Sequence, residues 1–200
     1  MSNGTKVKKR DGRIESLDLE KMHKMVEEAC KGLAGVSASQ VEIQSGIQFY
    51  DGMTTAEIQE ILIKSASDLI TLDNPNYQFV AARLLLFGVR KSLYGRTKEL
   101  PPLENHIYNC TNIDVYDKGI FDKYSLEEIQ KADSFIDHER DLLFTYAGLR
   151  QVVDKYLVQD RSTGKVYETP QFMYMMIALT IFSEYPKETR LNYVRRYYDA

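Results

Sequence analysis

Basic side chains crowd the start of this sequence, and they point to phosphate chemistry. Lysine and arginine neutralise a polyphosphate, and the backbone N–H groups at the start of a helix add donors and a favourable dipole. Here Glu15 and a helix start at Asp18 follow the cations closely. The combination suits a polyphosphate, but taken alone it is a modest signal, because a lysine-rich strand at a chain terminus is usually just solvated. The cations are Lys6, Lys8, Lys9, Arg10 and Arg13.

Other chemistry is poorly represented in the sequence. The phosphate-loop, dinucleotide-binding, His-Glu-x-x-His and Gly-x-Ser-x-Gly motifs are all missing, so the chain looks non-catalytic by itself. No histidine has a second histidine or a cysteine pair at ligand spacing, so we expect hydrogen-bonded or solvated side chains at His23, His106 and His138. We assign no chemistry to five acidic residues expected near helix ends or on polar faces: Glu127, Glu128, Asp137, Glu139 and Asp141.

Composition narrows the class of protein. The 200 residues are 44% hydrophobic and 28% charged, which is typical of a folded chain. A net charge of −3 argues against broad nucleic-acid binding. Neither an apolar run of about 18–20 residues nor a secretory signal is present, so we expect a cytoplasmic protein without a membrane partner. Two cysteines, Cys30 and Cys110, fit a reducing compartment and cannot build a four-cysteine zinc site.

A hairpin and a helix must present the cations. Residues 6–17 hold Asp11-Gly12 between two short, partly alternating stretches, and this dipeptide favours a two-residue turn that needs positive φ. Asp18 then stands at the N-cap position of a helix whose apolar residues recur as far as Leu33. The sequence therefore predicts a basic hairpin followed directly by a helix start.

Three more helices are predicted before residue 97. Residues 39–49 fit a strand period nearly as well as a helical one, and the capping-box form of Ser39 to Glu42 makes us favour a helix. A second capping box, Thr54 to Glu57, opens the next helix. Asn74-Pro75 starts another, which runs to Tyr94. We expect four helices under a small hairpin.

A second helical region follows Pro101-Pro102, which no helix can pass. We expect a short helix over 104–110, a helix opened by the capping box Ser125 to Glu128, and a helical stretch over about 142–156. Two short strands, 156–158 and 165–167, flank a turn.

The last two predicted helices indicate missing neighbours. A helix from Pro170 to Phe182 is apolar almost all round and must be covered on every side. The final helix, 186–200, reaches the end of the sequence without a terminating signal. We therefore expect further polypeptide, on this chain or another, to complete the second region.

Short sequence blocks follow one another through the chain in a distinctive order. The first half contains Val7-Lys8-Lys9-Arg10-Asp11-Gly12, Asp18-Leu19-Glu20-Lys21-Met22, Asp51-Gly52-Met53-Thr54-Thr55, Tyr77-Gln78-Phe79-Val80-Ala81-Ala82-Arg83 and Arg90-Lys91-x-x-Tyr94-Gly95. The second half contains Phe135-Ile136-Asp137-His138-Glu139-Arg140-Asp141, Lys155-Tyr156-Leu157-Val158, Glu168-Thr169-Pro170-Gln171-Phe172 and Tyr197-Tyr198-Asp199-Ala200. Over essentially its whole length the chain resembles the N-terminal portion, with the ATP-cone domain, of class I (aerobic) ribonucleoside-diphosphate reductase large (alpha) subunits.

The resemblance implies a mainly α fold in two domains. Residues 1–97 would form an ATP cone, a four-helix bundle capped by a small β-hairpin or three-stranded sheet. Residues 98–200 would form the helical N-terminal segment of the reductase large subunit, truncated before the catalytic barrel.

The resemblance also implies an allosteric site for ATP or dATP, together with Mg²⁺. Matched by position, Lys9 and Arg10 contact the effector phosphates, and Thr55 and Lys91 complete the site. Asp18 lies near the adenine amino group. The stretch that cradles the nucleotide comprises Glu15, Ser16, Leu17, Asp18, Leu19, Glu20 and Lys21.

The family reduces ribonucleoside diphosphates to deoxyribonucleoside diphosphates for DNA synthesis, and the resemblance implies this role for the complete enzyme. The reaction uses a transient cysteine radical and a reducing cysteine pair in the barrel, and neither Cys30 nor Cys110 matches these cysteines. The implied partners are the remainder of the large subunit or a complementing fragment, the small radical-generating subunit and a second large subunit in a homodimer. No cofactor for catalysis is expected on this chain.

Two positions depart from the family's bacterial members, where they are histidine; here they are Gln59 and Gly88. This difference predicts altered control by dATP.

Two other functions compete with a role in a reductase. A free-standing ATP-cone transcription regulator would carry a zinc ribbon with four cysteines, but this chain has two. A helical interaction module without nucleotide binding is disfavoured by the retained cations Lys9, Arg10, Lys21 and Lys91.

Overall fold

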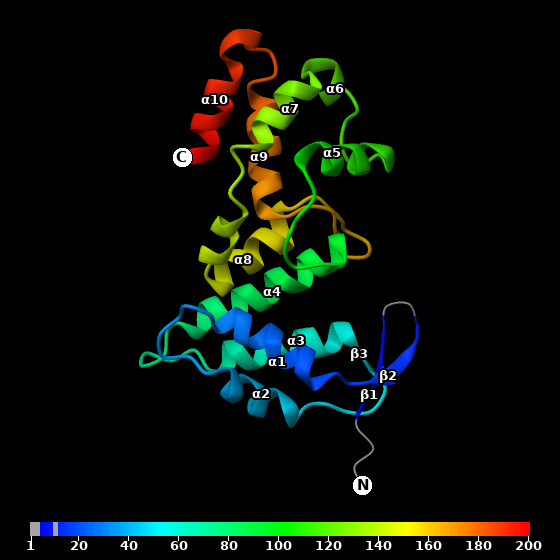
Figure 1. The fold of residues 1–200 in the computed structure, drawn as a ribbon, viewed down its shortest axis with the longest axis vertical. Coiled ribbons are helices and arrows are strands. Elements are labelled where there is room, and N and C mark those ends of the chain that lie inside the picture. Colours follow the sequence, from blue (N-terminus) through cyan, green and yellow to red (C-terminus); the bar gives the residue numbers. More distant parts are fainter. Residues whose placement is uncertain (1–4, 10–11) are drawn as a thin grey trace. The chain divides into compact units, whose positions relative to one another are not determined.

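The computed structural model of the chain describes residues 5–9 and 12–200, which are mostly helical and form two compact units. The first unit holds the described residues up to Gly88 together with Leu142–Arg150. The second unit holds Val89–Asp141 and Gln151–Ala200. Helix α4, Tyr77–Tyr94, is continuous and contributes residues to both units (Figure 1). The domain boundary at residue 97 stays a prediction, because these units are divided by packing alone.

The predicted hairpin is present, and it joins a third strand. Strand β1, Lys6–Lys8, pairs antiparallel with β2, Ile14–Ser16, and parallel with β3, Met53–Thr54. The sheet order is therefore β2-β1-β3. Gly12 has a φ of +87°, as the predicted turn requires, but the two-residue length is wrong: the Lys9 N–H donates to the Arg13 carbonyl at 2.8 Å, so three residues lie between the last paired residues. Two of these three residues, Arg10 and Asp11, lie outside the described residues.

Three helices of the first unit pack in sequence order, α1 on α2 and α2 on α3. Their bounds are Leu19–Cys30 for α1, Ala38–Gly46 for α2 and Thr55–Asp68 for α3. Residues 39–49 fitted a strand period nearly as well as a helical period, and in the structure they are helical as far as Gly46. The capping box predicted at Ser39 is wrong, because Ser37 is the N-cap residue and the helix starts earlier. The N–H of Ser37 donates to the Tyr77 hydroxyl oxygen at 3.0 Å. The capping box of Thr54 and Glu57 is confirmed.

Arg83 on α4 ties three segments of the first unit together. Its Nη1 donates to the carbonyls of Ala29, at 3.2 Å, and Lys31, at 2.7 Å, at the end of α1. Its Nε donates to the carbonyl of Leu142 at 3.5 Å, which helps to explain why residues 142–150 belong to this unit. The core contains Val26, Ala29, Val41, Leu62, Ala66, Val80 and Leu84, all with no measurable exposure.

The second unit consists of helices around α9. These are α5, Leu103–Asn112, α6, Ile120–Lys123, α7, Leu126–Asp133, α9, Pro170–Ile181, and α10, Lys187–Asp199. Helix α10 packs on α9 and α7, and α5 packs on α7. The capping box of Ser125 and Glu128 is confirmed. The core includes Leu103, Ile107, Ile129, Phe172, Met175, Leu179 and Val194.

The predicted helical stretch over about 142–156 is confirmed for residues 146–156, but it starts later than predicted and is not one regular helix. A 3₁₀ segment, His138–Leu143, precedes α8, Tyr146–Gln151, and a π-helical segment, Val152–Tyr156, follows it. The N–H of Leu157 donates to the carbonyl of Val152 at 3.0 Å, five residues back, and keeps residues 156–157 in the π turn. The strands therefore lie differently from the prediction, with β4 at Gln159–Asp160 and β5 at Lys165–Val166.

A buried polar network runs through the second unit. The Arg90 guanidinium donates to the Asp141 carboxylate at 3.0 Å, and Gln171 Nε2 donates to the other Asp141 oxygen at 2.9 Å. The Tyr198 hydroxyl then donates to Gln171 Oε1 at 2.6 Å. Asp141 was expected near a helix end or on a polar face, but it is 1% exposed. The expectation failed because its partners come from α4 and α9, far away in the sequence.

Within the described part of the chain, no helix combines the length and the apolar character that crossing a membrane requires.

Candidate nucleotide-binding site

The sheet brings together several of the residues predicted to bind the effector. Antiparallel pairing sets Val7 opposite Glu15, and parallel pairing sets Lys8 opposite Thr54. Lys9 and Thr55 are the next residues along these two paired segments. The predicted contributions of β1, β2 and the start of α3 therefore lie on neighbouring strands of one small sheet.

Lys9 carries its ammonium group beside an acidic partner. Its Nζ lies 3.4 Å from Glu15 Oε2, and the Arg13 guanidinium lies 3.2 Å from Glu15 Oε1. The side chains of Lys9 and Glu15 are 31% and 41% exposed. A half-exposed ion pair of this kind contributes about 0–1 kcal/mol, so an incoming anion can replace Glu15 at little cost. Arg10, the other predicted phosphate ligand, lies outside the described residues.

The start of α1 differs from the prediction in one respect. Asp18 is the N-cap residue, as predicted, and its carboxylate accepts from the Lys21 backbone N–H at 3.0 Å. The hydrogen bond from that N–H lowers the pKa of Asp18, with help from the Lys21 ammonium at 3.3 Å. The helix start was expected to offer backbone N–H donors to a phosphate, and the cap leaves the Lys21 N–H already bonded. A phosphate at this helix end must rely on the dipole and on side chains, or displace Asp18.

The segment between the hairpin and α1 is accessible. Ser16, Asp18, Leu19, Glu20 and Lys21 are exposed, and Glu15 and Leu17 are half-buried. Glu20 pairs with Lys24 one turn along α1, at 2.6 Å. Sequence reasoning did not single out Ile14, whose side chain is 68% exposed on β2; an exposed β-branched residue beside a basic turn is the signal that could have marked it.

Thr55 is the first residue of α3 and is half-buried. The N-cap role belongs to Thr54, whose hydroxyl accepts from the Glu57 N–H at 3.1 Å. The Glu57 carboxylate in turn accepts from the Thr54 N–H and from the Thr54 hydroxyl, each at 2.7 Å. These two bonds to the carboxylate lower the pKa of Glu57. The N-terminal cap of α3 is therefore formed by Thr54 and Glu57 and not by Thr55.

Lys91 lies in the last turn of α4, in the part of that helix that belongs to the second unit. Its contribution to the site stays a prediction. Gln59 and Gly88, the two positions expected to depart from the family pattern, face each other within the first unit. A Cβ on Gly88 would lie 3.1 Å from Gln59 Cγ, and Gln59 Nε2 donates to the carbonyl of Leu84 at 2.7 Å.

Some of the histidines and acidic residues outside this site have structural partners. His23 Nδ1 lies 2.7 Å from Glu42, which raises the pKa of this histidine. His106 is 2% exposed, and burial lowers its pKa to about 4. Glu128 pairs with Arg190. Among residues 5–9 and 12–200, no three His, Cys, Asp or Glu side chains cluster as a metal site would require.

Comparison with known proteins gives two domain matches. Residues 5–92 match the family described as ATP cone domain, and residues 142–200 match the family described as ribonucleotide reductase, all-alpha domain. The first match contains the sheet and α1–α3, and the second contains α9 and α10.

Whole proteins with these domains are similar along the entire chain. Ribonucleoside-diphosphate reductase 1 subunit alpha of Escherichia coli (strain K12) is 48% identical over 200 residues, which make up 100% of this chain and 26% of that protein. The subunit alpha of Haemophilus influenzae is also 48% identical, with the same coverage, and that of Enterobacteria phage T4 is 42% identical over 194 residues. The phage match covers 96% of this chain and 25% of that protein. The chain spans about a quarter of the length of these curated relatives. The chain therefore carries an ATP cone domain and a ribonucleotide reductase all-alpha domain, and it is similar along its whole length to the N-terminal quarter of ribonucleoside-diphosphate reductase alpha subunits.

Proposed function

We propose that this chain binds ATP or dATP on its first unit and thereby regulates a ribonucleoside-diphosphate reductase of which it is the N-terminal part. The observation that carries the proposal is the register of the small sheet. It sets Lys9, Glu15 and Thr55 on adjoining segments beside the start of α1, inside the region that matches an ATP cone domain. A reductase alpha subunit needs such a site only for control, because the effector is not consumed.

The phosphates are placed beside Lys9 and Arg10, with Lys21 and Lys91 as further cations. The Lys9 ammonium exchanges its weak pairing with Glu15 for a phosphate oxygen, a stronger charge-assisted hydrogen bond. The dipole of α1 favours the same negative charge. Thr55 offers a hydroxyl at the start of α3, where a helix dipole again points toward the ligand.

The base is placed against the segment from Glu15 to Glu20. Asp18 uses one oxygen on the Lys21 N–H, and a carboxylate has further lone pairs with which to accept from the adenine amino group. Ile14 and Leu19 are 68% and 61% exposed and offer apolar surface to a planar base. Covering these side chains would remove apolar area from water and favour binding.

A Mg²⁺ ion fits this site only when it is coordinated by the nucleotide phosphates and not by protein carboxylates. The carboxylates of Glu15 and Asp18 are engaged with Lys9 and Lys21, and the described residues do not form a cluster of metal ligands. A magnesium ion bound here would keep its phosphate oxygens and waters, as it commonly does.

The complete enzyme, on this proposal, reduces ribonucleoside diphosphates to deoxyribonucleoside diphosphates in the cytoplasm. Its partners are the remainder of the alpha subunit or a complementing fragment, a second alpha subunit and the small radical-generating subunit. The names and lengths of the relatives support this placement, since about three quarters of each relative lies outside the matched region.

Calorimetric titration of the chain with ATP and dATP tests the site. Replacing Lys9 and Lys91 together by Ala should weaken binding by at least an order of magnitude, because charge-assisted contacts contribute about 1.5–3 kcal/mol each. The control replaces Lys64 and Lys118 by Ala. These are also one lysine from each unit, and each is paired with an aspartate four residues away on the chain. Equal affinities for the two double variants would remove the assignment.

The same titration separates the second candidate, a helical interaction module. Such a module would show no heat of binding with either nucleotide, although the fold would be intact. A free-standing ATP-cone regulator is disfavoured by the match of residues 142–200 to a reductase domain.

A further inference from the structure

The segment that precedes β3 is fastened to β1 by two hydrogen bonds, and both involve the backbone of Lys6. The Lys6 N–H donates to Asp51 Oδ1 at 2.6 Å, and the Gly52 N–H donates to the Lys6 carbonyl at 2.8 Å. Gly52 has a φ of +87°, which a glycine adopts at no steric cost. Residues 51 and 52 therefore bind both backbone groups of Lys6.

These two bonds extend a very short pairing between strands. Strand β1 lies between β2 and β3 (Figure 1). Three residue pairs join β1 to β2, but only Val7 and Lys8 pair with β3, opposite Met53 and Thr54. Parallel pairing is also slightly less stable per residue than antiparallel pairing. The Asp51 carboxylate accepts a backbone N–H just before the first of these two pairs, so it adds a contact where the ladder has ended.

The same segment is also tied to the start of α3. The Tyr50 hydroxyl donates to Glu57 Oε1 at 3.0 Å. The other oxygen of Glu57 accepts from the N–H of Thr54, the N-cap residue of α3. Because Tyr50 and Asp51 are consecutive, one short segment contacts β1 on one side and the first turn of α3 on the other.

These contacts lie at the surface, next to a small buried core. Tyr50 and Asp51 are exposed, whereas Val7 and Met53, which pair across β1 and β3, are 2% and 1% exposed. Replacing Asp51 leaves this apolar contact in place, so the chain should still fold. The loss would fall on the register of the two strands.

We propose that Asp51 is a positioning residue for the nucleotide: through Lys6 it holds β1 in register with β3, so that Lys9 and Thr55 reach the same phosphate chain. The inference rests on the proposed function. Lys9 follows β1 directly, and Thr55 follows β3 directly. A slip of one residue would move Lys9 by about 3.3 Å along the strand and turn its side chain to the other face. A register that is set before binding costs the ligand less.

The charge of Asp51 separates positioning from simple electrostatics. Removing a carboxylate near a polyphosphate strengthens binding by charge alone, because like charges repel. Loss of the register weakens binding, because the nucleotide then binds only the fraction of molecules that hold the competent register. The two explanations predict opposite signs for the variant Asp51→Ala.

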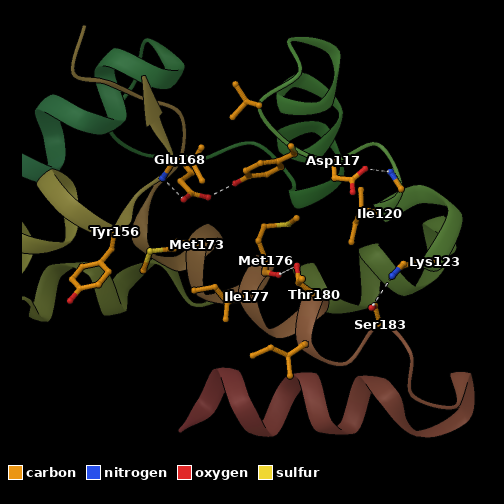
Figure 2. A pocket seen from close by; sticks show the side chains of 15 residues that line it. Asp117, Ile120, Lys123, Tyr156, Glu168, Met173, Met176, Ile177, Thr180 and Ser183 are labelled. Carbon is orange, nitrogen blue, oxygen red and sulfur yellow. Dashed lines mark hydrogen bonds between the residues drawn. The ribbon is translucent and has the colours of Figure 1, made fainter. Parts of the chain in front are cut away.

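Calorimetric titration of the chain with ATP measures this sign. Asp51→Ala should weaken binding about tenfold, which corresponds to a competent register held by about a tenth of the molecules. Asp51→Asn keeps an oxygen that accepts from the Lys6 N–H, so its affinity should stay within about threefold of the unsubstituted chain. The control, Asp117→Ala, removes another exposed carboxylate that accepts from a backbone N–H, that of Gly119 at 2.8 Å (Figure 2). Asp117 lies in the second unit, and its loss should not change the affinity.

Amide hydrogen exchange reports the register itself. In Asp51→Ala the Gly52 N–H should exchange at least about tenfold faster, and saturating ATP should restore its protection, because binding selects the paired register. In the unsubstituted chain, ATP at about 100 times its Kd should slow the same amide at least about tenfold. The Leu33 N–H, bonded to the Cys30 carbonyl at 3.1 Å, is the control and should exchange equally in both chains.

Several results would overturn the proposal. One is an Asp51→Ala variant that folds, as circular dichroism checks, and binds ATP as tightly as the unsubstituted chain or more tightly. Another is an Asp51→Asn variant as weak as Asp51→Ala, since the charge and not the hydrogen bond would then matter. Exchange of the Gly52 N–H that ignores ATP, with or without the substitution, would separate the register from binding. Absence of ATP binding by the unsubstituted chain is a failure of the proposed function, and its own titration records that separately.

Discussion

The ion pair of Arg90 and Asp141 makes a sharp prediction about stability, because both charges are almost fully buried. The guanidinium and carboxylate lie 3.0 Å apart, and their side chains are 4% and 0% exposed. Asp141→Asn keeps the size of the side chain and an oxygen that can accept from Gln171 Nε2. It removes the negative charge, so the Arg90 guanidinium stays buried without a counter-charge.

Removing one partner of a buried ion pair costs about 3–5 kcal/mol. Because Asn retains a hydrogen bond, we expect the lower end, about 3 kcal/mol of unfolding free energy. The matched control is Asp199→Asn. Asp199 pairs with Arg140 at 3.2 Å in the same unit, but these side chains are 45% and 39% exposed, and an exposed pair contributes about 0–1 kcal/mol.

Urea unfolding followed by far-ultraviolet circular dichroism measures both variants. A third variant, Asp141→Asn with Arg90→Met, should regain part of the loss, because neither charge is then buried alone. If Asp141→Asn and Asp199→Asn cost the same within about 0.5 kcal/mol, the argument from burial is refuted. The guanidinium also donates to the carbonyls of Thr97, at 3.4 Å, and His138, at 2.7 Å. If the added Arg90→Met makes the loss larger, these carbonyls stabilise the guanidinium and Asp141 does not.

Three further predictions concern acid stability, catalysis and control. Burial lowers the pKa of His106 to about 4 in the folded chain, whereas a histidine in the unfolded chain has a pKa near 6.5. The unfolded state therefore binds the proton more readily, and the free energy of unfolding falls as the pH drops from about 6.5 to about 4. Between pH 7 and pH 5 the chain should therefore lose about 2 kcal/mol more than a His106→Gln variant in urea unfolding, and equal losses would contradict the neutral, buried histidine. The purified chain should convert no ribonucleoside diphosphate, because its two cysteines cannot supply both a radical cysteine and a reducing pair; product formation by the chain alone would contradict this. The complete reductase should keep its activity as dATP saturates the cone, because Gln59 and Gly88 stand where the family's bacterial members have histidines, and a rate that falls to near zero in a dATP titration would show the opposite.

Local chemistry made much of the fold predictable. The boxes at Thr54 and Ser125 each place a hydroxyl three residues before a glutamate, and both cap helices as predicted. Asp18 also caps α1 as predicted, because its carboxylate accepts from the Lys21 N–H. Gly12 supports the hairpin because positive φ is cheap for glycine. In each case the information lies within a few residues.

The errors arose where distant residues decide the structure. Tyr77 bonds to the N–H of Ser37 and shifts the start of α2 away from Ser39. Arg83 holds the carbonyl of Leu142, so residues 142–150 join the first unit although their local pattern gives no such sign. Asp141 is polar in sequence and buried in structure because Arg90 and Gln171 reach it from other helices.

The residues of the candidate site come from the family pattern and stay a prediction, although the sheet register does set β1 and β2 together. The N-cap position predicted for Asp18 already implied its bond to the N–H at the start of α1. The pattern could not indicate that Glu15 pairs with Lys9. Such pairings depend on side-chain geometry, which a spacing argument does not contain.

The two kinds of ion pair in this chain suit two different tasks. Around the hairpin the pairs are half-exposed and weak, so Lys9 can exchange Glu15 for a phosphate at a cost of about 1 kcal/mol or less. In the second unit, exchange of the buried Arg90 partner would cost several times more, and the pair is further held by Gln171 and Tyr198. The weak pair at Lys9 is therefore suited to exchange with a ligand, whereas the buried pair at Arg90 is suited to holding a fixed arrangement of side chains. A regulatory subunit needs both properties, since an effector must bind reversibly to one region while another region holds a fixed surface for its partner.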